Sequence, residues 1–316
     1  MNSTRLKWPA AYDLSCSADG RLLACLGRNV VVIDLVARQR VSTSHPLQHP
    51  SAVDFSPGGG ALAVKATSGR IVVIDPGSGE VIHDHRNQKD GEGSGVSFSP
   101  DDDGLVDGSW NGALTVRRAR DSKILRREIF PGEMITRVTH DQSRRTWLVE
   151  HSPKVRPGEN MPASDYLTIR QWPFSPETTR TFTFGTHLES ATLSPDATRF
   201  CFIQNWDERR VHIARAADGQ ILTSSIPIQA GGTGSALAWS GDSRLIAVVS
   251  DGTFVFFRAS DLAVIGSVPC KHPSSVAFLP GMEELVLGSW NTTTIMKLGD
   301  AVKSLPFRTT HTLPPA

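Results

Sequence analysis

Apolar and polar positions alternate over short segments of this chain, and such alternation is typical of β-strands. One alternating segment recurs ahead of a small polar turn, and a more uniformly apolar segment follows the turn. The turns are expected at 17–20, 56–59, 99–102, 140–143, 194–197, 240–243 and 279–282. No long stretch carries the 3.6-residue period of an amphipathic helix, so the pattern predicts an all-β chain.

A third apolar segment follows in most units, at 29–34, 70–75, 114–117, 167–170, 211–214 and 254–257. A tight turn and a short fourth segment complete the unit, as at 76–82 and 218–222. Middle strands that are almost continuously apolar suit a sheet covered on both faces. The turns recur about every 40 residues, which is the period of a four-stranded propeller blade.

Two longer internal matches indicate duplication. Residues 49–57 (HPSAVDFSP) reappear as 272–280 (HPSSVAFLP), and the tetrapeptide Gly-Ser-Trp-Asn occurs at both 108–111 and 288–291. We therefore predict a single domain over 1–316. Its repeats are expected at about 10–49, 50–91, 92–133, 134–187, 188–232, 233–273 and 274–310.

The units resemble degenerate WD40 repeats over nearly the whole chain. The Ser-Pro-Asp-Gly-like turns and a histidine ahead of the first strand, at His49, His187 and His272, carry the resemblance. It implies a seven-bladed β-propeller of four-stranded antiparallel blades and buried hydrogen-bonding roles for these histidines. No third strand ends in the family's Trp-Asp. Either 5–8 or 302–307 could supply the last strand, and the resemblance favours the N-terminal segment.

Charge and composition exclude several function classes. Lys plus Arg is 33 and Asp plus Glu is 32, a net charge of +1, whereas a dedicated nucleic-acid binder usually carries a large basic excess. The chain shows no signal-peptide pattern at its start and no run of about 18 apolar residues. The four cysteines fit neither a metal knuckle nor a disulfide framework. We expect a cytoplasmic protein that binds neither nucleic acid nor membrane.

The loops that break the repeat are the best candidates for function. The longest departure is the proline-rich segment 151–165 of unit four. The loops between second and third strands also hold tryptophan and arginine, which are enriched at binding hot spots. Each tryptophan either folds over the adjacent blade or belongs to a binding face. The predicted binding residues are Trp110, Asn111, Arg156, Trp206, Asp207, Arg209, Trp290 and Asn291.

Candidate chemistry elsewhere is sparse. His83 and His85 share one face of an expected outer strand, but a stable metal site needs further ligands. A nucleophile elbow, a phosphate-binding loop and a dinucleotide fingerprint are all absent. The basic residues Arg117, Arg118, Arg120, Lys123, Arg126 and Arg127 are interpreted as a solvated blade edge. We expect no catalytic residue, metal or cofactor.

These observations favour a non-catalytic scaffold that binds a protein or peptide through the face formed by the second-to-third-strand loops. Such a propeller leaves few exposed sheet edges, which favours a monomer. Two alternatives stay open. One is a propeller enzyme, lactonase- or lyase-like, with its site in the central channel, since one fold hosts many functions. The other is a dedicated inhibitor or immunity protein for a toxin.

Overall fold

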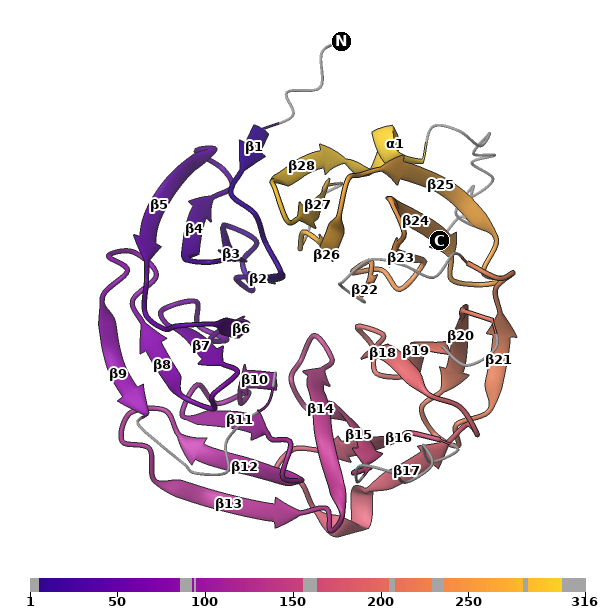
Figure 1. The fold of residues 1–316 in the computed structure, drawn as a ribbon, viewed down its shortest axis with the longest axis horizontal. Coiled ribbons are helices and arrows are strands. Elements are labelled where there is room, and N and C mark those ends of the chain that lie inside the picture. Colours follow the sequence, from indigo (N-terminus) through magenta and orange to yellow (C-terminus); the bar gives the residue numbers. More distant parts are fainter. Residues whose placement is uncertain are drawn as a thin grey trace, which may run out of the picture.

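The alternating segments form strands β1 to β28, which pair into seven four-stranded antiparallel sheets. The computed structural model describes residues 6–85, 93, 95–155, 164–204, 208–228, 236–280 and 284–302. The sheets stand side by side in a ring around a central channel (Figure 1). The chain is therefore a seven-bladed β-propeller, as predicted.

The first four blades follow the chain in order, each with its first strand innermost. Blade one comprises β2 (Asp13–Cys16), β3 (Leu22–Leu26), β4 (Val30–Asp34) and β5 (Gln39–Ser44). Blade two comprises β6 (Pro50–Phe55), β7 (Leu62–Ala66), β8 (Ile71–Ile74) and β9 (Val81–His85). Blade three comprises β10 (Gly95–Phe98), β11 (Gly104–Gly108), β12 (Ala113–Arg118) and β13 (Ile124–Ile129). Blade four comprises β14 (Glu133–His140), β15 (Thr146–Pro153), β16 (Tyr166–Gln171) and β17 (Arg180–Thr183), with the 3₁₀ turn η1 (Pro176–Thr178).

The remaining blades keep the same order until the last. Blade five comprises β18 (Leu188–Leu193), β19 (Arg199–Gln204), β20 (Arg210–Arg215) and β21 (Ile221–Ser224). Blade six comprises β22 (Leu237–Trp239), β23 (Leu245–Ser250), β24 (Thr253–Arg258) and β25 (Val264–Pro269). Blade seven comprises β26 (Pro273–Phe278), β27 (Glu284–Ser289), β28 (Thr293–Lys297) and, outermost, β1 (Leu6–Trp8).

The N-terminal strand closes the ring. β1 pairs antiparallel with β28, with Leu6 opposite Ile295 and Trp8 opposite Thr293. The Thr293 hydroxyl also donates to the carbonyl oxygen of Pro9 at 2.7 Å. The favoured N-terminal closure is therefore confirmed. A short helix, α1 (Leu298–Ala301), follows β28, and it is far too short to cross a membrane, as is every helix in the described part of the chain.

The hydrophobic core is divided into seven clusters, each at the contact between two neighbouring blades. β23 shows how a middle strand serves two of them. Ile246 and Val248 pack toward blade five, whereas Ala247 and Val249 pack toward blade seven. Successive side chains of a strand point to opposite faces, so a strand buried on both faces must be apolar throughout.

The turn between the first two strands of a blade has a recurring geometry. In five blades a serine hydroxyl, such as that of Ser17, accepts a hydrogen bond from the backbone N–H five residues later. The fourth turn residue takes a positive φ, +70° at Gly20 and +72° at Gly59. In blade four Asp141 takes the place of the serine, so this turn spans 141–144 rather than the predicted 140–143. Arg144 consequently has the positive φ, +57°.

Candidate functional site

The loops between second and third strands and the loops entering the first strands lie at one end of the ring, which we call the loop face. The opposite end, with the first-to-second-strand turns, is the turn face. Blades three and seven lie on nearly opposite sides of the channel (Figure 1). Their loops carry the duplicated tetrapeptide, so equivalent tryptophans are presented on either side of the channel mouth.

Trp290 is the most exposed of the tryptophans that the structure describes. It is 46% exposed, and it meets Tyr12 edge-on with ring centroids 6.3 Å apart. His272 stacks against its ring at 6.1 Å. Tyr12 is itself 49% exposed and precedes β2 of the neighbouring blade. Tyr12, His272 and Trp290 thus form an exposed aromatic cluster over the boundary between blades seven and one, which we call the aromatic rim.

Trp110 occupies the equivalent position in blade three and is 39% exposed. The serine before each tryptophan fixes its loop. The Ser109 hydroxyl donates to the carbonyl of Ala113 at 3.1 Å, and the Ser289 hydroxyl donates to the carbonyl of Thr292 at 2.8 Å. These loops are therefore held by their own hydrogen bonds, and the tryptophan rings do not have to be buried to keep them in place.

The other predicted binding residues divide into three groups. Asn111 and Asn291 accompany the two tryptophans on the loop face, Asn111 half-buried and Asn291 exposed. Arg209 is buried rather than exposed, because its guanidinium donates to the carboxylate of Glu189 and to the carbonyl of Val249 in blade six. Arg156, Trp206 and Asp207 lie outside the described residues.

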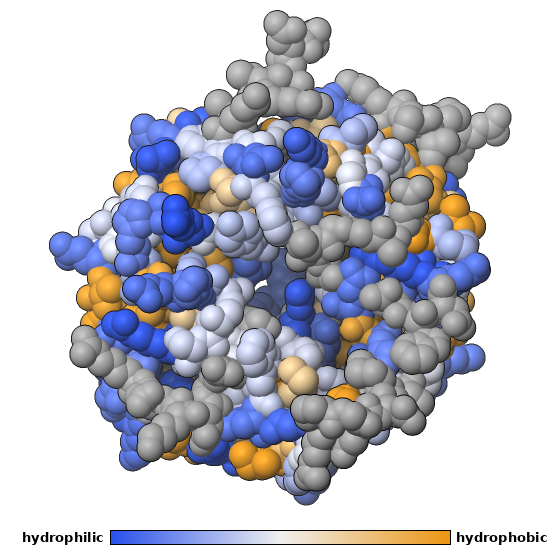
Figure 2. Space-filling view, viewed as in Figure 1, coloured by the Kyte–Doolittle hydropathy of each residue, from blue (hydrophilic) through white to orange (hydrophobic). Residues whose placement is uncertain are grey.

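The central channel contains two recesses near the loop face. One has a volume of about 270 Å³ and is lined from blades one to four, by residues that include Tyr12, Asp13, Arg137 and His140. The second has a volume of about 230 Å³ and lies between blades four and five. Its lining includes Arg137, Glu150, His151, Asp165 and Glu189. Figure 2 shows a central hollow bordered mainly by hydrophilic residues, with hydrophobic patches toward the outer edge.

Burial raises the pKa of one carboxyl group in each of these recesses. Burial raises the pKa of Glu150 above its ordinary value, although Arg137 and the backbone N–H of Ala191 oppose the rise. Burial likewise raises the pKa of Asp13, opposed by the backbone N–H of Val53 and by Arg137. The Arg137 side chain lies 3.9 Å from Glu150 and lines both recesses. One arginine is thus shared between carboxylates that burial disfavours in their charged form.

His151 belongs to a buried hydrogen-bond network of blade four. Its Nδ1 contacts the carboxylate of Glu133, and its Nε2 lies 2.7 Å from the hydroxyl of Thr168. That hydroxyl lies 2.8 Å from the hydroxyl of Thr181. Burial lowers the pKa of His151, and Glu133 opposes this shift. Because Thr168 is only 1% exposed, this network connects strands and does not present a nucleophile.

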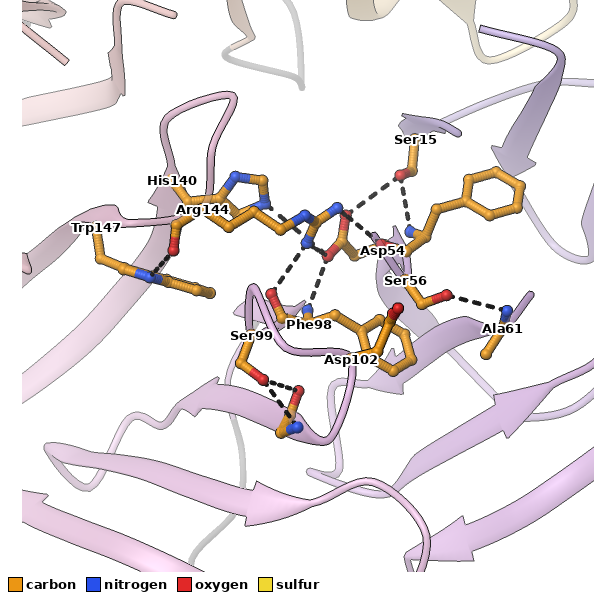
Figure 3. A network of polar contacts seen from close by, with 12 residues as sticks. Ser15, Asp54, Ser56, Ala61, Phe98, Ser99, Asp102, His140, Arg144 and Trp147 are labelled. Atoms are coloured by element: carbon orange, nitrogen blue, oxygen red, sulfur yellow. Dashed lines mark hydrogen bonds and ion pairs between the residues drawn. The ribbon is translucent and has the colours of Figure 1, made fainter. Parts of the chain in front are cut away.

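At the turn face Arg144 connects three blades. Figure 3 shows its guanidinium between Asp54 and the inner strand of blade three. It pairs with Asp54 through both terminal nitrogens, and it donates to the carbonyls of Phe55 at 2.7 Å and Phe98 at 3.0 Å. Asp54 also accepts from the backbone N–H of Phe98 at 2.9 Å. Asp54, Phe55 and Phe98 end the first strands of their blades, so this contact lies at the turn-face end of the channel.

The histidines at the start of the repeats correct the expectation drawn from WD40 repeats. His49 and His272 are exposed, not buried, and His187 is half-buried with Nδ1 3.5 Å from Asp165. His49 and His272 each take a positive φ immediately before the proline that begins a first strand. With no Trp-Asp at the end of the third strand, the partners that would bury such a histidine are missing.

The histidine pair of β9 and the basic cluster of blade three do not form a reactive site among the described residues. His83 and His85 lie together in β9 with ring centroids 4.7 Å apart, but the described residues contain no cluster of three or more metal-binding side chains. The basic cluster is split. Arg117 is buried and pairs with Asp107, which also holds the fully buried Lys65 of blade two. The remaining arginines face solvent or neighbouring turns.

The channel residues Tyr12, Asp13, Arg137, Glu150 and Asp165 were not predicted. They come from blades one and four, and no spacing along the chain shows that these two blades meet across the channel. One signal was available: Glu150 directly follows the apolar segment 147–149 of its strand, and a buried polar residue is more informative than an exposed one.

Comparison with known proteins supports the fold alone. No protein-family model matches the chain, and no curated protein matches it. The structure is similar to that of Kuenenia stuttgartiensis hydrazine synthase, with a TM-score of 0.74 and 14% identity over 92% of this chain and 96% of that one. It is also similar to the β-propeller domain of Myceliophteria thermophila Cps50 (Swd1), with a TM-score of 0.73 and 12% identity over 94% and 99% of the two chains. At such identities the likeness extends to the seven-bladed propeller and no further.

Proposed function

We propose that this protein is a WD40-like binding module that holds a protein or peptide segment on its loop face and does not catalyse a reaction. One observation carries the proposal. Trp110 and Trp290 stand in duplicated loops on opposite sides of the channel mouth, 39% and 46% exposed. A single segment that crosses the mouth can contact both.

The energy available at these positions suits an anchor. A tryptophan side chain buries up to about 250 Å². Covering the exposed part of each ring removes roughly 100 Å² of largely apolar surface from water, worth about 2–3 kcal/mol at about 25 cal/mol per Å². Two such anchors match the pattern of hot spots, in which a few aromatic residues supply most of the binding energy.

The finer features of the proposal follow from the chain itself. Cys16, Cys25, Cys201 and Cys270 are all free, which is the usual state in the cytoplasm. Every blade packs against its two neighbours around a closed ring, and this supports a monomer that recruits others. We therefore propose a cytoplasmic scaffold whose own surface supplies the recognition.

Affinity capture from native lysate, analysed by mass spectrometry, tests the proposal. Wild type is compared with a Trp110→Ala/Trp290→Ala variant. The matched control is Ile82→Ala/Leu222→Ala, which removes apolar residues that are 57% and 45% exposed on outer strands. A partner retained by wild type and control and lost by the tryptophan variant is expected. A partner retained by all three proteins would place recognition elsewhere and overturn the proposal.

A catalytic channel is the second candidate, because Asp13 and Glu150 have raised pKa values and line solvent-reaching recesses. A carboxyl group held neutral can act as a general acid, as a lactonase- or lyase-like reaction requires. A screen of lactone and uronide substrates tests it, with Glu150→Gln as the comparison. Activity that the substitution abolishes would establish this candidate in place of a binding module.

A further inference from the structure

The channel mouth between the two tryptophans opens onto an acidic interior, and this bears on the kind of segment that the proposed binding function recruits. The inference below rests on that proposed function. First strands run from the loop face toward the turn face, so the start of β2, where Asp13 lies, is near the mouth. Asp165 directly precedes β16, and Glu150 lies in the half of β15 that is nearer the loop face.

Counting charges gives this interior its sign. Glu189 is neutralised by Arg209, and Asp54 by Arg144. Three acidic groups, Asp13, Glu150 and Asp165, then stand beside the one guanidinium of Arg137 among the described lining residues. Burial favours the protonated forms of Asp13 and Glu150, so their negative charge develops fully only beside a further cation.

The two histidines of the lining do not offset this excess. Burial lowers the pKa of His140 and of His151, which favours their neutral forms. His140 is further disfavoured as a cation by Arg144. His187 stands 3.5 Å from Asp165 at the edge of the second recess and is half-buried. The recesses therefore lack a second strong cation beside Arg137 in the described part of the lining.

Such a recess is complementary to a positively charged side chain. Burial works against the charged forms of Asp13 and Glu150, and a cation placed beside either carboxyl group stabilises its charged form. A carboxylate or phosphate would meet three acidic groups and one arginine, so it is disfavoured by the same charges. Each recess has a volume of about 230–270 Å³, several times the ~30 Å³ that one water molecule occupies in the liquid. A long, slender side chain can enter.

We propose that the segment bound on the loop face inserts a lysine or arginine side chain into the channel, toward Asp13, Glu150 and Asp165. Apolar side chains on either side of this basic residue contact Trp110 and Trp290. The partner is thus an extended peptide segment with a central basic residue between apolar ones. The tryptophans supply the affinity, and the acidic interior selects the residue that enters.

A random peptide library displayed on phage provides the probe. Clones are selected on the immobilised full chain, and only those that lose binding to the Trp110→Ala/Trp290→Ala variant are kept. The selected peptides are then synthesised with a fluorescent label, and their affinities are measured by anisotropy. A second set carries glutamine in place of the basic residue.

Two isosteric substitutions test the acidic groups without removing their structural hydrogen bonds. Glu150→Gln keeps an oxygen for the Ala191 N–H, and Asp13→Asn keeps one for the Val53 N–H. Asp261→Asn is the matched control, because it changes the net charge equally at an exposed turn, where Asp261 pairs with Arg258 and accepts a hydrogen bond from the N–H of Ala263. Loss of a charge-assisted contact is expected to weaken binding about tenfold.

The expected result is enrichment of lysine or arginine at one position, with at least about tenfold weaker binding to Glu150→Gln or Asp13→Asn and unchanged binding to Asp261→Asn. Peptides that depend on the tryptophans but lack a basic residue would overturn this inference and leave the loop-face function intact. The inference would also be overturned if basic peptides bound Glu150→Gln, Asp13→Asn and Asp261→Asn with equal affinity. Equal weakening of binding by the channel variants and by the Asp261→Asn control falls under the same outcome. A library that yields no tryptophan-dependent clone would overturn both proposals.

Discussion

Replacing Arg144 with methionine tests how the blades are held together at the turn face. Methionine keeps the packing of the aliphatic part of the side chain but removes the guanidinium, with its charge and four hydrogen bonds. Asp54 would then lie 90% buried, and among the described residues the remaining ionisable base near it is His140, whose Nε2 is 3.9 Å away and whose pKa burial lowers. The perturbation therefore leaves a buried carboxylate uncompensated.

The magnitude follows from the burial of both partners. The side chains of Arg144 and Asp54 are only 12% and 10% exposed, so solvent screens their interaction weakly. Breaking a buried pair by removing one partner costs about 3–5 kcal/mol. Asp54 retains the N–H of Phe98 and the hydroxyl of Ser15 as donors, which places the expected loss near the lower figure.

Guanidinium chloride unfolding followed by tryptophan fluorescence measures this loss, with two further variants. Arg144→Gly also removes the contact with Asp54, but glycine adopts the positive φ of +57° without strain. This variant is therefore expected to be about 1 kcal/mol more stable than Arg144→Met. Arg144→Met/Asp54→Asn removes the stranded charge and should lose less than the two single changes added together. A loss below about 1 kcal/mol for Arg144→Met would refute the reasoning, because a pair that weak behaves as a surface ion pair.

Three further predictions concern other parts of the ring. The Glu150→Gln variant should become more stable relative to wild type as pH rises. Burial raises the pKa of Glu150 in the folded protein above its ordinary unfolded value. The charged Glu150 side chain therefore destabilises the folded wild type only above the ordinary value, and this cost grows with pH until the folded pKa is passed. Urea unfolding from pH 4 to 8 measures it, and a difference that shrinks with pH would contradict the assignment. Deleting residues 1–10 removes β1 and exposes the edge of β28, which should promote aggregation. Early elution in size-exclusion chromatography would show it. An unchanged elution volume with unchanged stability would contradict closure of the ring by β1. Trp110→Ala and Trp290→Ala should each lower the free energy of unfolding by about 1–3 kcal/mol, because the rings are 39% and 46% exposed and only their covered part is lost from packing. A loss above about 3 kcal/mol would show that the tryptophan is a core residue.

The sequence by itself determined the propeller. The period of about 40 residues, the serine-containing turns and the uninterrupted apolar middle strands are all local features, and each blade packs only on its neighbours. Local pattern was therefore sufficient for blade number and strand order. It also placed Trp110 and Trp290 correctly on the loop face, because the loop between the second and third strands is defined by its position within the unit.

Only the tertiary structure decided what surrounds those tryptophans. Arg209 belongs to a loop of the predicted type, but its guanidinium is buried on Glu189 and on the next blade, a contact that no spacing within one unit reveals. Glu150 lies opposite Arg137 in the pairing of β14 with β15, but Asp13 of blade one meets this arginine only because the ring closes around a channel. Closure brings charges from distant repeats into one confined, poorly solvated space. A channel's electrostatics are thus a property of the assembled ring and not of any repeat.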